Sequence, residues 1–149
     1  MNALRRFARA AGGQSVVETA VIAPFLFALL IGVVDLGRLY RFNMIVGTSA
    51  RAGAQYGAQN LTTAIDYAGM VLAAKADSQN LTGLTATATS LCTCADGSAT
   101  ACTATACSAT HRLLYVSVTS SYTYSTLFNY RVIPQTIPLS RTVVLQELQ

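Results

Sequence analysis

The most prominent hydrophobic feature of the chain is an almost uninterrupted apolar run over residues 16–36. Between Thr19 and Val34 this run contains no charged residue. A helix rises about 1.5 Å per residue, so about 21 residues reach roughly 31 Å, close to the thickness of a bilayer core. The pattern predicts one membrane-spanning helix with an acidic residue near each end, Glu18 and Asp35. The alternative is the buried core helix of a soluble domain.

Beyond residue 36 the apolar residues recur at steps of three and four, which predicts that the helix continues to about residue 59. This part carries a stripe of small residues, and such stripes let helices approach closely: Ala50, Gly53, Ala54 and Gly57. The stripe serves packing on the domain's own sheet, packing against another subunit, or both. Within the apolar run, Pro24 predicts a kink or local unwinding over residues 20–24, because proline lacks the N–H that a helix needs.

A break and a new helix start are predicted at Asn60, whose side chain can cap a helix. The second helix should be amphipathic and end near Asp77. Its predicted apolar face consists of Ile65, Ala68, Leu72 and Ala76.

Alternating patterns further along the chain predict strands over residues 85–90, 112–126 and 139–148, with a proline-containing connection over residues 129–138. In the middle strand one face should carry Leu114, Val116 and Val118. The layout is a long helix, a second helix and an antiparallel sheet of three or four strands, which is an α+β fold. We therefore expect three parts: a basic leader over residues 1–13, a membrane-spanning and extended helix over 14–59, and an α+β domain over 60–149.

The charges of the chain argue against nucleic-acid binding and against enzymatic chemistry. The formal net charge is +4, and only 11% of residues are charged. No cluster of Lys and Arg lies beside aromatic residues in the distal domain, so its composition does not indicate a nucleic-acid-binding face. His111 is the only histidine, the acidic residues are scattered, and no phosphate-binding loop or serine-hydrolase turn occurs. We expect no enzyme activity and no cofactor.

All four cysteines fall within a short loop rich in Ala, Thr and Ser, over residues 92–107: Cys92, Cys94, Cys102 and Cys107. A bond between the first two would close a strained small ring. Two disulfides from the first pair to the second pair are therefore predicted, in either of two connectivities, and they would persist outside the cytoplasm. The alternative is a metal site with His111 as a further ligand, but the cysteine spacing differs from that of usual zinc sites. We expect no bound metal.

The first 13 residues have the composition of a targeting segment, being basic and ending in two glycines. The small residues precede the apolar run, so a peptidase acting there would leave the helix on the protein. The segment from Gly13 through Gln14 to Glu18 resembles the class III signal of type IV pilins and pseudopilins. In those proteins the prepilin peptidase cuts after a glycine, and a glutamate is the fifth residue after the cut, as Glu18 is here.

The sequence that follows resembles the TadE family, small pilin-like proteins of the Tad (Flp) pilus system. Members typically read G-x-x-x-V-E-x-A-x-x-x-P, then a leucine-rich run, D/E-x-G-R-x-x-Y and A-x-R-A-G-A. The family's aromatic position is Arg41 here, and the nearest aromatic residue is Tyr40. The residues that match the first three elements here are Gly13, Val17, Glu18, Ala20, Pro24, Asp35, Gly37 and Arg38, and residues 49–54 match the last. The resemblance covers residues 12–58.

This resemblance implies a minor pilin or pseudopilin that acts in a type IV (Tad/Flp) filament or in its inner-membrane assembly complex. Its implied partners are other pilin-like subunits through the N-terminal helix, the prepilin peptidase, the inner-membrane assembly platform and the membrane. Glu18 would pair with the free amine of a neighbouring subunit, which cleavage before Gln14 creates. Pro24, Asp35, Gly37 and Arg38 are the further assembly residues.

The expected location is the bacterial inner membrane, crossed once, with the C-terminal domain periplasmic or extracellular and incorporation into an extracellular filament. Two alternatives stay open. One is a major filament subunit of the same ancestry. The other belongs to a different class, a membrane-anchored periplasmic metal-binding or redox module that uses the cysteines.

Overall fold

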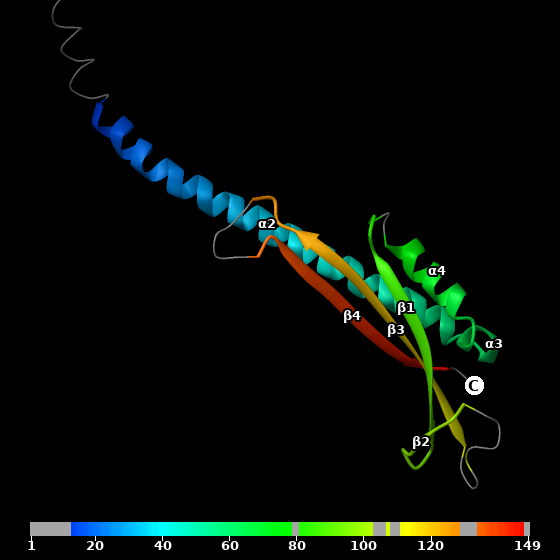
Figure 1. The fold of residues 1–149 in the computed structure, drawn as a ribbon. Helices are drawn as coiled ribbons and strands as arrows, with labels where there is room; N and C mark the ends of the chain where they lie inside the picture. Colours follow the sequence, from blue (N-terminus) through cyan, green and yellow to red (C-terminus); the bar gives the residue numbers. More distant parts are fainter. Residues whose placement is uncertain (1–12, 79–80, 103–106, 108–110, 129–133, 148–149) are drawn as a thin grey trace, which may run out of the picture. The chain divides into compact units, whose positions relative to one another are not determined.

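The computed structural model of the chain describes residues 13–78, 81–102, 107, 111–128 and 134–147. Residues 1–12 of the predicted leader lie outside the described residues. The chain forms two compact units, residues 1–38 and 39–149. The helices and strands, shown in Figure 1, are α2 Gly13–Gly57, α3 Leu61–Ala64, α4 Tyr67–Asp77, β1 Thr85–Cys94, β2 Ala99–Thr100, β3 Arg112–Ser125 and β4 Thr136–Gln146. The predicted α+β class with a long N-terminal helix is confirmed.

Helix α2 runs over 45 residues and contains Pro24. The helical assignment is unbroken there, so the chain does not unwind over residues 20–24, and a kink at Pro24 stays a prediction. Proline removes one N–H and therefore one bond to the carbonyl of Ala20, but the bonds on either side hold the turn. One turn earlier, the Thr19 hydroxyl donates to the Ser15 carbonyl at 2.8 Å, which satisfies the only hydroxyl of the apolar run within the helix.

The predicted second helix is in fact two helices, α3 and α4. Asn60 caps α3 as predicted, accepting from the N–H groups of Thr62 and Thr63, and Asp66 caps α4 by accepting from Gly69 N–H at 2.9 Å. The break at residues 65–66 changes the rotation of the second helix. Its buried face consists of Met70 and Ala74, and the predicted apolar face is exposed instead, at Ile65, Ala68, Leu72 and Ala76. The predicted buried face was wrong.

The four strands form one antiparallel sheet in the order β2-β1-β3-β4. The face of β3 predicted to be apolar is confirmed as the buried one, with Leu114 at 6% exposure and Val116 and Val118 fully buried. Alternate residues point to opposite faces of a strand. This alternation gives the sheet one face toward the helices and one away from them.

Two strand boundaries differ from the prediction. Strand β1 runs on past residue 90 to Cys94, so the first two cysteines lie in a strand rather than in a loop. Threonine favours strands, and the ladder to residues 112–115 of β3 extends the pairing. Strand β4 begins at Thr136 and includes Pro138, so the connection predicted over residues 129–138 ends before residue 136. Since β4 is an edge strand, the missing proline N–H can face the side that has no partner strand.

The core of residues 39–149 lies between the sheet and helices α2 and α4. It is lined by Ala54, Ala58, Met70 and Ala74 from the helices and by Cys92, Leu114, Val116 and Val118 from the sheet. Two buried hydroxyl groups, those of Ser49 and Ser120, lie between the helix and the sheet. The Ser49 hydroxyl donates to the Ala74 carbonyl at 2.8 Å and lies 3.1 Å from the Ser120 hydroxyl. These bonds satisfy the polar groups that burial would otherwise leave unpaired.

Candidate functional site

The N-terminal half of α2 has an exposed apolar surface around nearly its whole circumference. Over residues 15–34 almost every side chain is exposed, for example Val21 at 73% and Phe25 at 69%. In the part of the chain that the structure describes, α2 is the one helix long and apolar enough to cross a membrane. An apolar surface of this extent is stable only when lipid or other protein covers it. This exposed surface is the strongest functional feature of the chain.

Two of the predicted assembly residues, Glu18 and Pro24, lie on this surface. Both side chains are exposed. Glu18 makes neither a hydrogen bond nor an ion pair among the described residues. A carboxylate in an apolar segment is costly without a partner and is a functional candidate for that reason. Gly13 and Gln14, the predicted processing site, form the first two residues of α2.

Asp35 and Arg38 lie one helical turn apart in α2 and face each other. The distance from Arg38 Nη1 to Asp35 Oδ1 is 4.0 Å, and the Asp35 side chain is only 6% exposed. A buried carboxylate needs such a positive partner because burial penalises its charge. Between them, Gly37 has no neighbouring atom within 4 Å of where a Cβ would lie. Within the described chain, no close contact requires a glycine at position 37.

The stripe of small residues in α2 packs inside its own domain. Ala50 and Ala54 are fully buried, and Gly53 and Gly57 are also buried. A Cβ on Gly53 would lie 2.7 Å from the Met70 carbonyl oxygen and 3.1 Å from Ala74 Cβ, so α2 and α4 approach closely there. Of the two uses left open from the sequence, the structure shows packing within the domain.

The cysteines form two disulfides, Cys92–Cys102 and Cys94–Cys107. This is one of the two connectivities that the sequence left open. Cys92 and Cys94 are buried on the inner face of β1, so the bonds attach the following segment to the sheet. No free cysteine remains. The described residues contain no group of three or more His, Cys, Asp or Glu side chains able to hold a metal ion.

A hydrogen-bonded cluster at the start of α4 could not be predicted from residue types and spacing. The Tyr56 hydroxyl donates to Asp66 Oδ2 at 2.9 Å, and Gly69 N–H donates to Asp66 Oδ1 at 2.9 Å. The Gly69 bond, and then the Tyr56 bond, lower the pKa of Asp66 below its ordinary value of 3.8. The hydrogen bond to the carboxylate and its negative charge raise the pKa of Tyr56 above 10.0. The cluster ties α4 to α2, and its role is structural.

A second apolar surface lies on α3 and α4, where the predicted buried face points outward. Its large side chains are exposed by 43–67%: Leu61, Ile65, Tyr67 and Leu72. Because the opposite side of α4 is buried against α2, the helix is apolar on two sides. A helix of that kind is usually covered on both sides. This α4 surface is therefore a second candidate contact surface.

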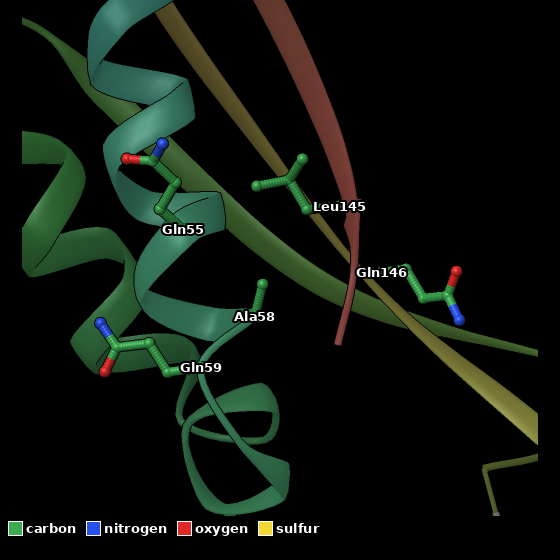
Figure 2. Close-up of a pocket in the computed structure, with 5 residues that line it drawn as sticks. All are labelled: Gln55, Ala58, Gln59, Leu145 and Gln146. Carbon is green, nitrogen blue, oxygen red and sulfur yellow. The ribbon is translucent and has the colours of Figure 1, made fainter. Parts of the chain in front are cut away.

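The pocket shown in Figure 2 lies between the last turns of α2 and the end of β4. Its volume is about 260 Å³, and it is lined by Gln55, Ala58, Gln59, Leu145 and Gln146. Leu145 points toward α2, whereas Gln146 points to the other side of β4. The pocket is smaller than usual ligand sites, and its lining holds no ionisable group. It offers no chemistry for catalysis.

Comparison with known proteins supports the family resemblance of the N-terminal helix. Residues 13–55 match the model of the family described as TadE-like protein. No curated protein and no solved structure matches the chain. The matched segment contains the exposed apolar surface of α2, Glu18, and the Asp35–Arg38 pair. Over residues 13–55, the chain is therefore similar to the TadE-like family, which suggests a protein related to the Tad pilus.

Proposed function

We propose that this protein is a pilus subunit or pilus-assembly protein, a TadE-like minor pilin or pseudopilin that packs against other pilin-like subunits through the N-terminal half of α2. The observation that carries the proposal is the exposed apolar surface over residues 15–34, which belongs to the TadE-like segment. In the described part of the chain, the side chains of this surface are almost all exposed. Lipid covers it while the protein resides in the membrane, and neighbouring helices replace the lipid on assembly.

In this packing, Glu18 pairs with the N-terminal amine of a neighbouring subunit. Cleavage between Gly13 and Gln14 by the prepilin peptidase creates a positive amine at the new N-terminus. In the low dielectric of a helix bundle that amine needs a negative partner, since an unpaired buried charge is strongly destabilising. Glu18 of a neighbouring subunit supplies it. The exposed position of Glu18 within its own chain supports this role.

The proposed topology places residues 39–149 outside the cytoplasm, with one crossing of the bacterial inner membrane. Three arginines precede the apolar run and three follow it closely, so the distribution of positive charge alone does not orient the helix. The two disulfides support an oxidising compartment for the distal domain. In spheroplasts, external protease should digest that domain. Full protection in intact spheroplasts would contradict this topology.

The exposed α4 surface supplies a second contact with partner subunits. The outer positions of α3 and α4 that form it, Leu61, Ile65, Tyr67 and Leu72, carry no charge, which favours an apolar protein partner. An interfacial membrane helix would instead be rich in Lys and Arg along its polar face. Lys75 is the single basic residue of α4.

Three measurements test the proposal and its alternatives. N-terminal sequencing of protein from membranes that contain the prepilin peptidase should begin at Gln14; a sequence that begins at Met1 would contradict processing. The amount of the protein in sheared filaments then separates a minor subunit from a major one. The alternative of a metal-binding or redox module requires free thiols, so four alkylatable cysteines in protein extracted without reductant would favour it over the pilin-like role.

A further inference from the structure

The face of the sheet that points away from the helices is a regular array of hydroxyl groups. Two rows cross the three long strands in register: Thr85, Ser121 and Ser140 form one row, and Thr87, Thr119 and Thr142 form the next. We call these six residues the hydroxyl face. The intervening residues of β1 and β3, such as Ala86, Ala88 and Val118, pack toward the core, so the two sets lie on opposite sides. Figure 1 shows the three strands side by side.

The geometry of the hydroxyl face is repetitive. The hydroxyl oxygens of Thr119 and Thr142 lie 2.8 Å apart, and those of Ser121 and Ser140 lie 3.1 Å apart. Successive rows are about 7 Å apart along the strands, and neighbouring strands are about 4.8 Å apart. Each hydroxyl has one donor and two acceptor sites. A hydroxyl pair uses one donor and one acceptor, so the face offers both donors and acceptors at regular intervals.

The hydroxyl face carries no charge, and neither do the other outward positions of β1, β3 and β4. Solvent-facing strands usually carry charged residues, especially lysine on edge strands, that keep sheets from associating. Without cations the face cannot attract phosphate groups, and without carboxylates it cannot hold a metal ion. Val144, at the next position along β4, is its one large exposed apolar neighbour on that strand. The matching ligand is neutral and rich in hydroxyl groups.

An aromatic residue lies beyond these rows on the same face. Tyr115 stands opposite Leu91 on β1 and Gln146 on β4, and its side chain is half-buried. The face of an aromatic ring is electronegative and attracts the polarised C–H groups of a sugar ring. Tyr115 therefore adds a stacking position at one end of the hydroxyl array.

We propose that the outer face of the sheet binds a neutral polysaccharide, with the hydroxyl face bonding to sugar hydroxyls and Tyr115 stacking on a sugar ring. The proposal rests on the proposed function in one respect, the location of residues 39–149 outside the cytoplasm. It goes beyond that function because it assigns a ligand class to a surface that subunit packing through α2 leaves unused.

The test is retention of the full chain on insoluble cellulose, chitin and starch, in a detergent whose headgroup is not a sugar. Heparin-agarose serves as the charged comparison. The protein should be retained on at least one neutral polysaccharide and released by the soluble hexasaccharide of the same polymer. Retention should be equal at low and high salt, because no charge takes part. Lack of retention on all three, or release by salt alone, would overturn the proposal.

The variant that isolates the hydroxyl groups is Thr87→Val combined with Thr119→Val. These residues pair across β1 and β3, and valine keeps both the shape and the strand preference of threonine. Loss of two hydrogen bonds should weaken binding at least about fivefold. The matched control is Thr62→Val, an exposed threonine on α3, which should bind like the unchanged protein.

Two further outcomes complete the test. Tyr115→Leu should weaken binding with the disulfides intact, which checks that the domain has folded. The proposal would be refuted if the double valine variant were retained as well as the unchanged protein. It would also be refuted if the soluble oligosaccharide did not release the bound protein. The assay needs no other pilus component, so its failure would leave subunit packing through α2 untouched, and a failure of that packing would leave the binding assay unaffected.

Discussion

Replacing Gly53 by alanine tests the close packing of α2 against α4. A Cβ at this position would lie 2.7 Å from the Met70 carbonyl oxygen, 3.0 Å from Val118 Cγ1 and 3.1 Å from Ala74 Cβ. Carbon atoms in ordinary contact are about 3.5–4.0 Å apart. Helix and sheet would both have to move away from α2, and the carbonyl belongs to the backbone and cannot rotate aside as a side chain would.

The expected magnitude follows from two opposing effects. Overpacking a core costs about 1–3 kcal/mol, and the rigid carbonyl places Gly53→Ala in the upper part of that range. Alanine favours a helix over glycine by about 1 kcal/mol. The free energy of unfolding should therefore fall by about 1–2 kcal/mol. For a domain of this size that lowers the melting temperature by at least about 4 °C.

Gly47 in the same helix provides a matched control. The nearest atom to a Cβ there is Arg141 Cγ at 4.0 Å, so Gly47→Ala gains helix preference without a clash and should stabilise by up to about 1 kcal/mol. Thermal unfolding of the full chain in detergent, followed by tyrosine near-ultraviolet circular dichroism, measures both variants. Buried Tyr124 reports on the core. Equal shifts for the two variants, or a Gly53→Ala protein as stable as the unchanged one, would refute the packing.

Three further predictions follow from the distal domain. Non-reducing peptide mapping should recover the Cys94–Cys107 link, and a peptide joining Cys94 to another cysteine would contradict the connectivity. Replacing both residues by serine should lower the free energy of unfolding by about 2–3 kcal/mol, because the link closes a loop with a sequence separation of 13. The fold lowers the pKa of Asp66 and raises that of Tyr56, so their hydrogen bond should lose its stabilising effect as the pH falls below about 3.8 and as it rises above about 10.0. Tyr56→Phe should therefore reduce the loss of stability above about pH 10.0 in denaturation measurements. An unchanged loss of stability at alkaline pH would contradict the bond. Leu72→Gln, at a side chain 67% exposed, should leave stability within about 0.5 kcal/mol but reduce co-purification with partner subunits, whereas unchanged co-purification would remove the α4 surface from the interface.

The elements of the fold that carry strong periodic patterns could be predicted from the sequence. The long apolar run and the alternation of Leu114, Val116 and Val118 specified α2 and β3 because their burial patterns are simple. The face of α4 could not be predicted in this way. Its rotation depends on the Asp66 cap and on the fit of Met70 against glycines of α2, which are contacts between distant parts of the chain.

Some features of the candidate sites could likewise be predicted from the sequence, whereas others depend on contacts between distant parts of the chain. Glu18 and the cysteines could be identified from residue type and spacing, but the choice between two disulfide connectivities required the ladder that places Cys92 and Cys94 on the inner face of β1. The hydroxyl face was invisible for the same reason. Threonines along one strand suggest an ordinary polar surface, and only the register of three strands turns them into rows.

In the proposed function, the exposed half of α2 packs against other pilin-like subunits, with Glu18 as the partner of a neighbouring amine. The most direct test of this packing is the co-purification of Glu18→Ala with those subunits from cells that carry the complete pilus machinery, measured together with leader removal, membrane retention and presence in the sheared pilus fraction. Gly13→Leu is the comparison and should remain unprocessed and unassembled. Glu18→Ala should be processed and retained in the membrane, yet be absent from the pilus fraction and from complexes with other subunits. If Glu18→Ala assembles as the unchanged protein does, the proposed packing mechanism is wrong.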